Sequence, residues 1–182
     1  SLGGPPGGAI VTNDTEIAEK LDRIAFPGMT ANFDAAKSAA LAVTMLDWKE
    51  FGEEYVAQMI FMSKTLASSL EDYGIPVFFG ALGHTQSHQF AVLAEEYGGG
   101  QSASKLLRKS GFLACGIGLP VKELGEDLNG LRFGTPELVR WGMTAKHSNK
   151  IAELVAKALK GQNVSDQVSK WRRTFNKIHF VN

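Results

Sequence analysis

The first half of the chain carries apolar residues at helical spacing. One stripe follows Asn13 and Asp14, either of which can cap a helix start, and Pro27-Gly28 then ends the helix. The stripe consists of Ile17, Leu21 and Ile24. An alanine-rich segment over 35–48 predicts a second helix, and residues 50–73 predict a third and longer one. Gly74 is placed to end it as a C-cap.

The second half changes to short β-like runs. Four strands are predicted, over 76–80, 88–94, 112–119 and 131–134, with a helix over 102–110 between the second and third. Two more helices follow: one begins near Thr144 or Ser148, and the last covers about 165–178. A few strands with helices on one side predict an α/β protein of the α+β kind.

A short strand is also predicted close to the start of the chain. The segment "GGPPGG" at residues 3–8 predicts a turn, because proline fixes φ and glycine allows conformations that other residues avoid. The run "AIVT" at 9–12 then reads as a buried strand. The chain opens with Ser1, which is expected to follow either methionine removal or a cut inside a longer protein.

Composition limits which classes of partner and which cellular compartment are expected for this protein. Nineteen basic and nineteen acidic residues cancel in a chain of 182, so no net charge favours nucleic acid or a membrane surface. No apolar run is long enough to span a bilayer, and there is no signal-peptide pattern. The single cysteine, Cys115, fits a reducing compartment, and its apolar neighbours predict a buried structural thiol. A cytoplasmic protein with one core is expected.

Common catalytic motifs do not account for the chain. His84 and His88 have the spacing of two metal ligands on a helix, but they lead into a strand with no glutamate between them, so no metal is predicted. The nucleophile elbow of a hydrolase is missing, and the glycine-rich turn lacks the ending of a phosphate-binding P-loop. The residues alone therefore offer binding elements without a visible catalyst.

The segment "LRFGTPELVRWG" at 131–142 places an arginine in an apolar strand. A buried, unpaired guanidinium is costly, so Arg132 must reach water or meet an anion. One hypothesis pairs it with an acid such as Glu137 or Glu123. The other makes it a bidentate clamp for a substrate carboxylate, held at the rim of the sheet by the Gly-Thr-Pro break that follows.

Several motifs together resemble glycine/serine hydroxymethyltransferases, which are pyridoxal-phosphate enzymes of fold type I. "LRFGTPELVRWG" resembles the family's R-x-G-T-P-A-x-x-x-R-G segment, and "SLGGPPGGAIV" resembles the stretch that follows its cofactor lysine. "IAFPG" and "TQSHQFAV" match two further segments in the same order. The similarity runs through about residue 160.

The resemblance implies roles for particular residues. Arg132 would bind the α-carboxylate of a small amino-acid substrate, and Thr30 and Asn32 would lie near the phosphate of pyridoxal 5'-phosphate. The Schiff-base lysine would stand immediately before Ser1, so no catalytic residue is assigned within the chain, and the 182 residues alone are expected to be inactive. His88 is expected to have a structural hydrogen-bonding role, and His147 to start a helix.

The same resemblance implies an organisation into domains. Residues 1–32 would end the large cofactor domain, 33–73 would form interdomain helices, and 74–182 would form the small domain. Family members are dimers or larger, so a homo-oligomer is expected. The alternative from another class is a non-catalytic interaction module that keeps the fold.

Two departures from the family pattern bear on the reaction. "MTANFD" replaces a glycine-rich phosphate loop, and "ACGIGLP" replaces the segment with asparagine near the folate, which puts Cys115 and Gly116 where polar residues are usual. Tetrahydrofolate use is therefore doubtful. Hydroxymethyltransferase-like retro-aldol chemistry and a folate-independent reaction, by a threonine-type aldolase, transaldolase or aminotransferase, both stay open.

Overall fold

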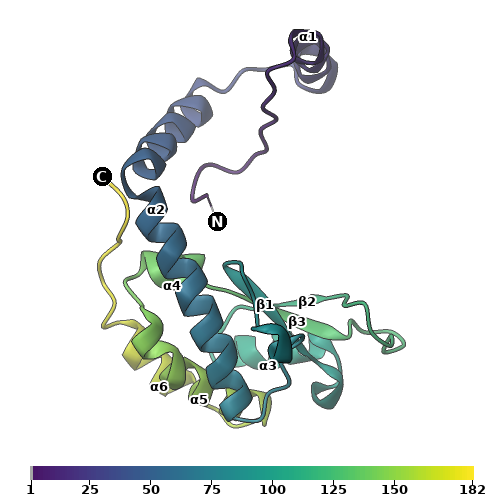
Figure 1. The fold of residues 1–182 in the computed structure, drawn as a ribbon, viewed down its shortest axis with the longest axis vertical. Helices are drawn as coiled ribbons and strands as arrows, with labels where there is room; N and C mark the ends of the chain where they lie inside the picture. The colour runs from purple at the N-terminus through teal and green to yellow at the C-terminus, as the bar shows by residue number, and fades with distance from the viewer. Residues whose placement is uncertain (1) are drawn as a thin grey trace. The chain divides into compact units, whose positions relative to one another are not determined.

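The computed structural model describes residues 2–182 and divides the chain into two compact units, Ser1–Glu50 and Phe51–Asn182 (Figure 1). The first unit contains α1 (Thr15–Arg23), the π-helical turn η1 (Ile24–Met29) and the start of α2 (Ala35–Asp72). The Asp14 carboxylate accepts a hydrogen bond from Ile17 N at 3.0 Å, which confirms one of the two predicted caps. The predicted assignment of 1–32, 33–73 and 74–182 to enzyme domains stays a prediction.

The predicted strand over 9–12 does not form in the described chain. Residues 9–12 have no strand partner, and Ile10 and Val11 are 75% and 93% exposed. A strand is defined by hydrogen bonds to a neighbouring strand, and apolar residues alone cannot supply them.

The two helices predicted over 35–48 and 50–73 are one helix, α2, of 38 residues. No proline lies within it, and the single Gly52 near its middle is tolerated in a helix. The predicted end is confirmed: Gly74 has φ +79°, and Ile75 N donates to Leu70 O at 3.0 Å. Glycine is favoured there because this conformation strains other residues.

The second unit combines the rest of α2 with helices and one small sheet. In chain order it contains η2 (Gly80–Leu82), β1 (Gln89–Leu93), η3 (Glu95–Tyr97), α3 (Gly100–Lys109), β2 (Cys115–Ile117), β3 (Gly130–Gly134), α4 (Pro136–Arg140), η4 (Ala145–His147), α5 (Ser148–Leu159) and α6 (Ser165–Arg172). This mixture of helices and an antiparallel sheet is the α+β architecture that was predicted.

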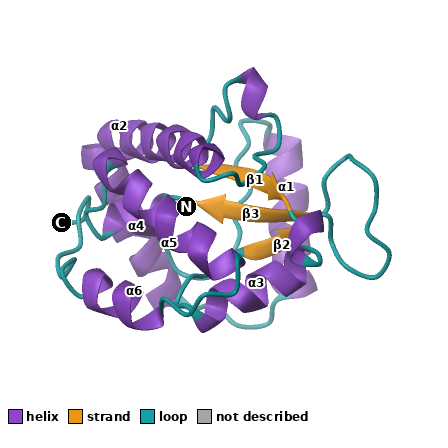
Figure 2. Cartoon of the chain, turned by 90° about the horizontal axis from the view of Figure 1, so that it is seen from below, coloured by secondary structure: helices purple, strands orange, loops and turns teal. Residues whose placement is uncertain are grey.

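The sheet is antiparallel with the order β1-β3-β2, so β3 is the middle strand (Figure 2). The strands predicted over 88–94 and 131–134 are confirmed, and every end agrees within one residue. Of the strand predicted over 112–119, only the three residues of β2 form a strand. The strand predicted over 76–80 is reduced to a single bridge between Val77 and Val92, because the chain turns at Phe79, which has φ +58°.

One face of the sheet packs into the core. Phe90 and Phe133 are cross-strand partners whose rings stack at 5.5 Å between centroids. Helices α2 and α5 supply many of the other buried apolar side chains: Tyr55, Met59, Met62, Leu66, Leu70, Ile151, Leu154, Val155, Ala158 and Leu159. In the view of Figure 1 the strands lie to the right of the second half of α2, and α5 and α6 lie to its left.

The last helix is shorter than predicted. It was expected to reach residue 178, but α6 ends at Arg172. Thr174 N and Phe175 N close tight turns onto Trp171 O and Arg172 O, and the Arg172 side chain donates to Phe175 O at 2.8 Å. Local bonding thus takes up the backbone groups that a longer helix would use. No helix among residues 2–182 is long and apolar enough to cross a membrane.

Candidate functional site

Arg132 stands at the centre of the sheet, on the face that does not pack into the core. Its neighbours Leu131 and Phe133 are 0% and 8% exposed, while Arg132 itself is exposed. The alternation follows from strand geometry, because successive side chains point to opposite faces. The arginine that looked buried from its apolar neighbours therefore projects into solvent from a rigid strand.

Neither ion pair considered for Arg132 forms. The described residues contain no carboxylate within 4.0 Å of its guanidinium, so Glu137 and Glu123 are both excluded as partners in this structure. Its fork of donors remains available to a ligand. Guanidinium matches a carboxylate with two parallel hydrogen bonds, so an exposed arginine on a middle strand suits that ligand.

The end of β3 is held by Thr135. This side chain is 0% exposed, and its Oγ1 lies 2.8 Å from Met59 O on α2 and 3.1 Å from His88 O before β1. Thr135 N also donates to His88 O at 3.0 Å. One residue thus connects the strand that carries Arg132 to a helix and to the adjoining strand.

Helix α4 begins directly after Thr135, and Tyr55 contacts both its first and its last residue. Pro136 occupies the start of α4, where its missing N–H costs nothing. Tyr55 Oη donates to Pro136 O at 3.0 Å, and the Arg140 guanidinium lies 4.5 Å from the Tyr55 ring centroid. Burial raises the pKa of the Tyr55 phenol, against an opposite effect of Arg140, so the hydroxyl remains a donor.

The C-terminal segment closes over the same cluster. Arg140 Nη1 donates to Phe180 O at 2.5 Å, and the Phe180 ring stacks on Tyr55 with 5.2 Å between centroids. Sequence patterns did not identify Tyr55, Arg140 or Phe180, because these residues are far apart in the chain. Thr135 carried a signal in the Gly-Thr-Pro break, where a small hydroxyl side chain precedes a helix start.

The position of Cys115 corrects a prediction. It was expected to be a buried structural thiol, but it is exposed. Cys115 in β2 pairs with Arg132 in β3, and paired residues share a face of the sheet. Ala91 in β1 is the partner on the other side of Arg132. The hydrophobicity of neighbouring residues could not reveal this register.

The loop between β2 and β3 is organised by two polar residues that the sequence patterns did not single out. Asn129, 6% exposed, accepts from Leu119 N at 2.7 Å and donates from Nδ2 toward Leu119 O, Val121 O and Lys122 O. Asp127 accepts from Gln101 N and Ser102 N at the start of α3. The bond from Gln101, followed by those from Ser102, lowers the pKa of the Asp127 carboxyl.

A glycine contact brings α3 close to the strand of Arg132. A Cβ added at Gly100 would clash with Gly130 O, so only glycine allows this approach without a shift. Gly100 N donates to Leu128 O at 2.6 Å. The start of α3 therefore helps to fix the beginning of β3, whereas Thr135 fixes its end.

The loop with Thr30 and Asn32 belongs to the first unit, whereas Arg132 belongs to the second. Thr30 directs both of its donors at Ala25 O, with distances of 2.7 Å from Oγ1 and 2.9 Å from N. Asn32 is exposed, and within residues 2–182 its side chain makes no hydrogen bond. A phosphate needs donors, so Asn32 fits such a ligand, whereas Thr30 shapes the loop.

The histidines take local structural positions. His147 Nδ1 accepts from Thr144 N at 2.9 Å, which confirms its predicted place at a helix start, and burial lowers its pKa. His84 Nε2 lies 2.7 Å from Glu71 Oε2, and His88 contributes its carbonyl to Thr135. Within residues 2–182 no three His, Cys, Asp or Glu side chains gather as a metal site.

Comparison with known proteins places this geometry in context. The chain is 54% identical over 185 residues to an alpha-methylserine aldolase from Ralstonia sp, covering 100% of this chain and 42% of that protein. It is 33% identical over 181 residues to a serine hydroxymethyltransferase from Pyrobaculum aerophilum, covering 97% and 42%. No family model matches the chain.

A solved structure has the same fold. The L-threonine transaldolase from Pseudomonas fluorescens matches 99% of this chain and 42% of its own, with a TM-score of 0.84 and 23% identity. The chain thus spans about 42% of the length of the relatives it matches. These similarities confirm the resemblance and the fold class predicted from sequence.

The Thr135 contacts predict a specific loss of stability. In the protein, Thr135→Val keeps the volume but removes the buried hydroxyl that contacts Met59 O and His88 O, and these carbonyls keep only their backbone donors, so the free energy of unfolding should fall by about 1–3 kcal/mol. Urea denaturation measures this value. Thr65→Val is the matched control, because the Thr65 hydroxyl bonds Phe61 O at a more exposed site and should cost less. Equal effects of the two variants would contradict the role of Thr135.

Proposed function

We propose a function on the premise that this chain belongs to the serine hydroxymethyltransferase-like family of fold type I pyridoxal-phosphate enzymes, whose C-terminal part it matches. In this proposal the chain supplies the substrate-carboxylate site of an enzyme that cleaves the Cα–Cβ bond of a small 3-hydroxy amino acid. The relatives named alpha-methylserine aldolase suggest 2-methylserine as the first substrate to test.

Arg132 carries the proposal. It is exposed, it forms no ion pair with another described residue, and it stands on the middle strand of a sheet whose end is fixed by Thr135. The proposed ligand is the α-carboxylate, bound by two parallel hydrogen bonds. A rigid strand favours this use, because little backbone freedom remains to be lost on binding.

The reaction proposed for 2-methylserine is a retro-aldol cleavage that gives alanine and formaldehyde. The Cα–Cβ bond breaks, the hydroxyl proton leaves as the carbonyl forms, and a proton returns to Cα. Pyridoxal phosphate, when bound, takes up the electrons released at Cα. By holding the carboxylate, Arg132 fixes the rotation about Cα and so decides which of its bonds is placed to break.

Cofactor contacts within this chain are proposed for one loop only. Asn32 would donate to the phosphate, and Thr30 would hold the loop through Ala25. The Schiff-base lysine predicted to precede Ser1 stays a prediction, and no lysine of the chain was predicted for that role. A homo-oligomer and a cytoplasmic location are likewise proposals that rest on the family resemblance and on composition.

We propose that the reaction does not use folate. Cys115 and Gly116 stand where the family pattern has polar residues, and Cys115 is exposed beside Arg132. The relatives named alpha-methylserine aldolase are 47–54% identical, whereas those named serine hydroxymethyltransferase are 32–37% identical. Hydroxymethyl transfer to tetrahydrofolate is the second candidate, supported by the latter group.

The role of Arg132 predicts a large kinetic effect. In the full-length enzyme, Arg132→Leu should lower kcat/KM for 2-methylserine by about 100-fold or more, because two charge-assisted hydrogen bonds are lost. Arg132→Lys should recover only part of this, since lysine cannot form the bidentate pair. Arg108→Leu, at an exposed arginine of α3, is the matched control and should behave like the parent. An unchanged kcat/KM in Arg132→Leu would refute the assignment.

Folate dependence separates the two candidate reactions. Formaldehyde release from 2-methylserine should proceed at the same rate with and without added tetrahydrofolate, measured by trapping the aldehyde. Serine should be cleaved slowly or not at all under either condition. A rate on serine that rises strongly with tetrahydrofolate would establish hydroxymethyl transfer and exclude the folate-independent proposal.

A further inference from the structure

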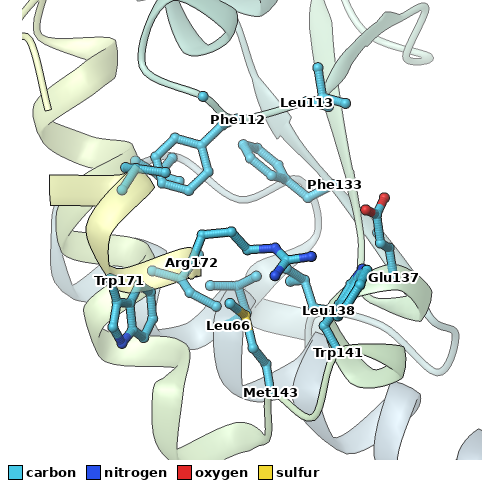
Figure 3. A pocket seen from close by; sticks show the side chains of 15 residues that line it. Leu66, Phe112, Leu113, Phe133, Glu137, Leu138, Trp141, Met143, Trp171 and Arg172 are labelled. Atoms are coloured by element: carbon cyan, nitrogen blue, oxygen red, sulfur yellow. The ribbon is translucent and has the colours of Figure 1, made fainter. Parts of the chain in front are cut away.

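A cavity of about 210 Å³ lies on the opposite face of the sheet from Arg132. Phe133, the next residue along β3, points to this face and forms part of the wall (Figure 3). The other walls come from the segment before β2 and from α2, α4, α5 and α6. Most of the lining is apolar and much of it aromatic, including Phe112, Phe133, Trp141, Val155, Val168 and Trp171.

Arg172 extends into this cavity from the last turn of α6, as Figure 3 shows. Its guanidinium carbon lies 4.1 Å from the centroid of the Trp141 ring, and its Nη1 donates to Phe175 O at 2.8 Å. These contacts fix the planar group without using all five of its N–H donors. Within residues 2–182 no carboxylate lies within 4.0 Å of it.

Glu137 lines the same cavity from the first turn of α4. It forms no ion pair with Arg172 or with any other cation of the described chain. The cavity therefore presents one positive and one negative group, at separate positions, beside an apolar and aromatic interior.

From this arrangement we infer that the cavity binds a free α-amino acid with an apolar side chain of one ring or one branched group. The α-carboxylate pairs with Arg172, the α-ammonium faces Glu137, and the side chain lies among the rings. A plain carboxylate would leave Glu137 unpaired, and a plain amine would leave Arg172 unpaired. Pockets for drug-sized ligands span roughly 300–1,000 Å³, so this smaller cavity suits a small molecule.

This inference is independent of the proposed reaction, and isothermal titration calorimetry tests it directly. The full-length protein is titrated with L-phenylalanine, phenylacetate and 2-phenylethylamine. L-phenylalanine should bind at least about tenfold more tightly than either single-charge analogue, since only it satisfies both charged groups. Arg172→Gln and Glu137→Gln should each weaken its binding by about tenfold.

Matched variants distinguish binding in this cavity from binding at another surface of the protein. Lys170→Gln on the same helix and Glu126→Gln in an exposed loop remove the same charges elsewhere and should leave the affinity unchanged. Arg132→Leu should also leave it unchanged, because that residue lies on the other face of the sheet. Thermal melting checks folding, and Glu137→Gln, at an exposed position, keeps the test available if Arg172→Gln is unstable.

Four results would overturn the inference. These are no measurable binding of L-phenylalanine, equal binding of phenylacetate or 2-phenylethylamine, retained affinity in a folded Arg172→Gln or Glu137→Gln protein, and loss of binding in Arg132→Leu. The last would assign the amino acid to the face of Arg132 instead.

Discussion

The buried hydroxyl of Thr135 is the contact on which the proposed site depends. It lies within hydrogen-bond distance of a carbonyl on α2 and a carbonyl before β1, at the point where β3 gives way to α4. Thr135 is 0% exposed, and leaving a buried hydroxyl unpaired is costly, so these bonds hold Thr135 against both neighbouring segments. The strand cannot slide or twist without breaking them. The same bonds hold the backbone of Arg132, three residues earlier in β3.

Successive side chains of β3 give the two faces of the sheet different chemical character. Leu131 and Phe133 complete the core and the aromatic cavity, while Arg132 projects outward between Ala91 and Cys115. A shift of register by one residue would exchange these faces and bury the guanidinium. The glycine contact between Gly100 and Gly130, together with the bonds of Asn129, opposes such a shift. Structure and binding chemistry are thus set by the same few residues.

Sequence patterns predicted the elements that depend on local periodicity. They failed for features that depend on pairing between distant parts of the chain. The helix that begins after Asp14 and the Gly74 end follow from spacing and capping residues. Local patterns also predicted a helix over 102–110, where α3 lies, a helix beginning near Thr144 or Ser148, where α5 begins, and the strands around Arg132. The exposure of Cys115 depends on its register with β3, and the strands predicted over 9–12 and 76–80 depended on partners that apolar runs do not specify. At the site, a motif identified Arg132, whereas Tyr55 acts on α4 from 81 residues away and had no signal in the sequence.

The central claim is that Arg132 binds the substrate carboxylate, and a coupling measurement tests it most directly. Steady-state kinetics of the full-length enzyme would compare 2-methylserine with its carboxamide, in the parent protein and in Arg132→Leu. The account predicts that the parent prefers the acid strongly and that the variant no longer distinguishes the two, because each change removes the same interaction. Equal preference for the acid in both proteins would show that the carboxylate binds elsewhere and would contradict the account.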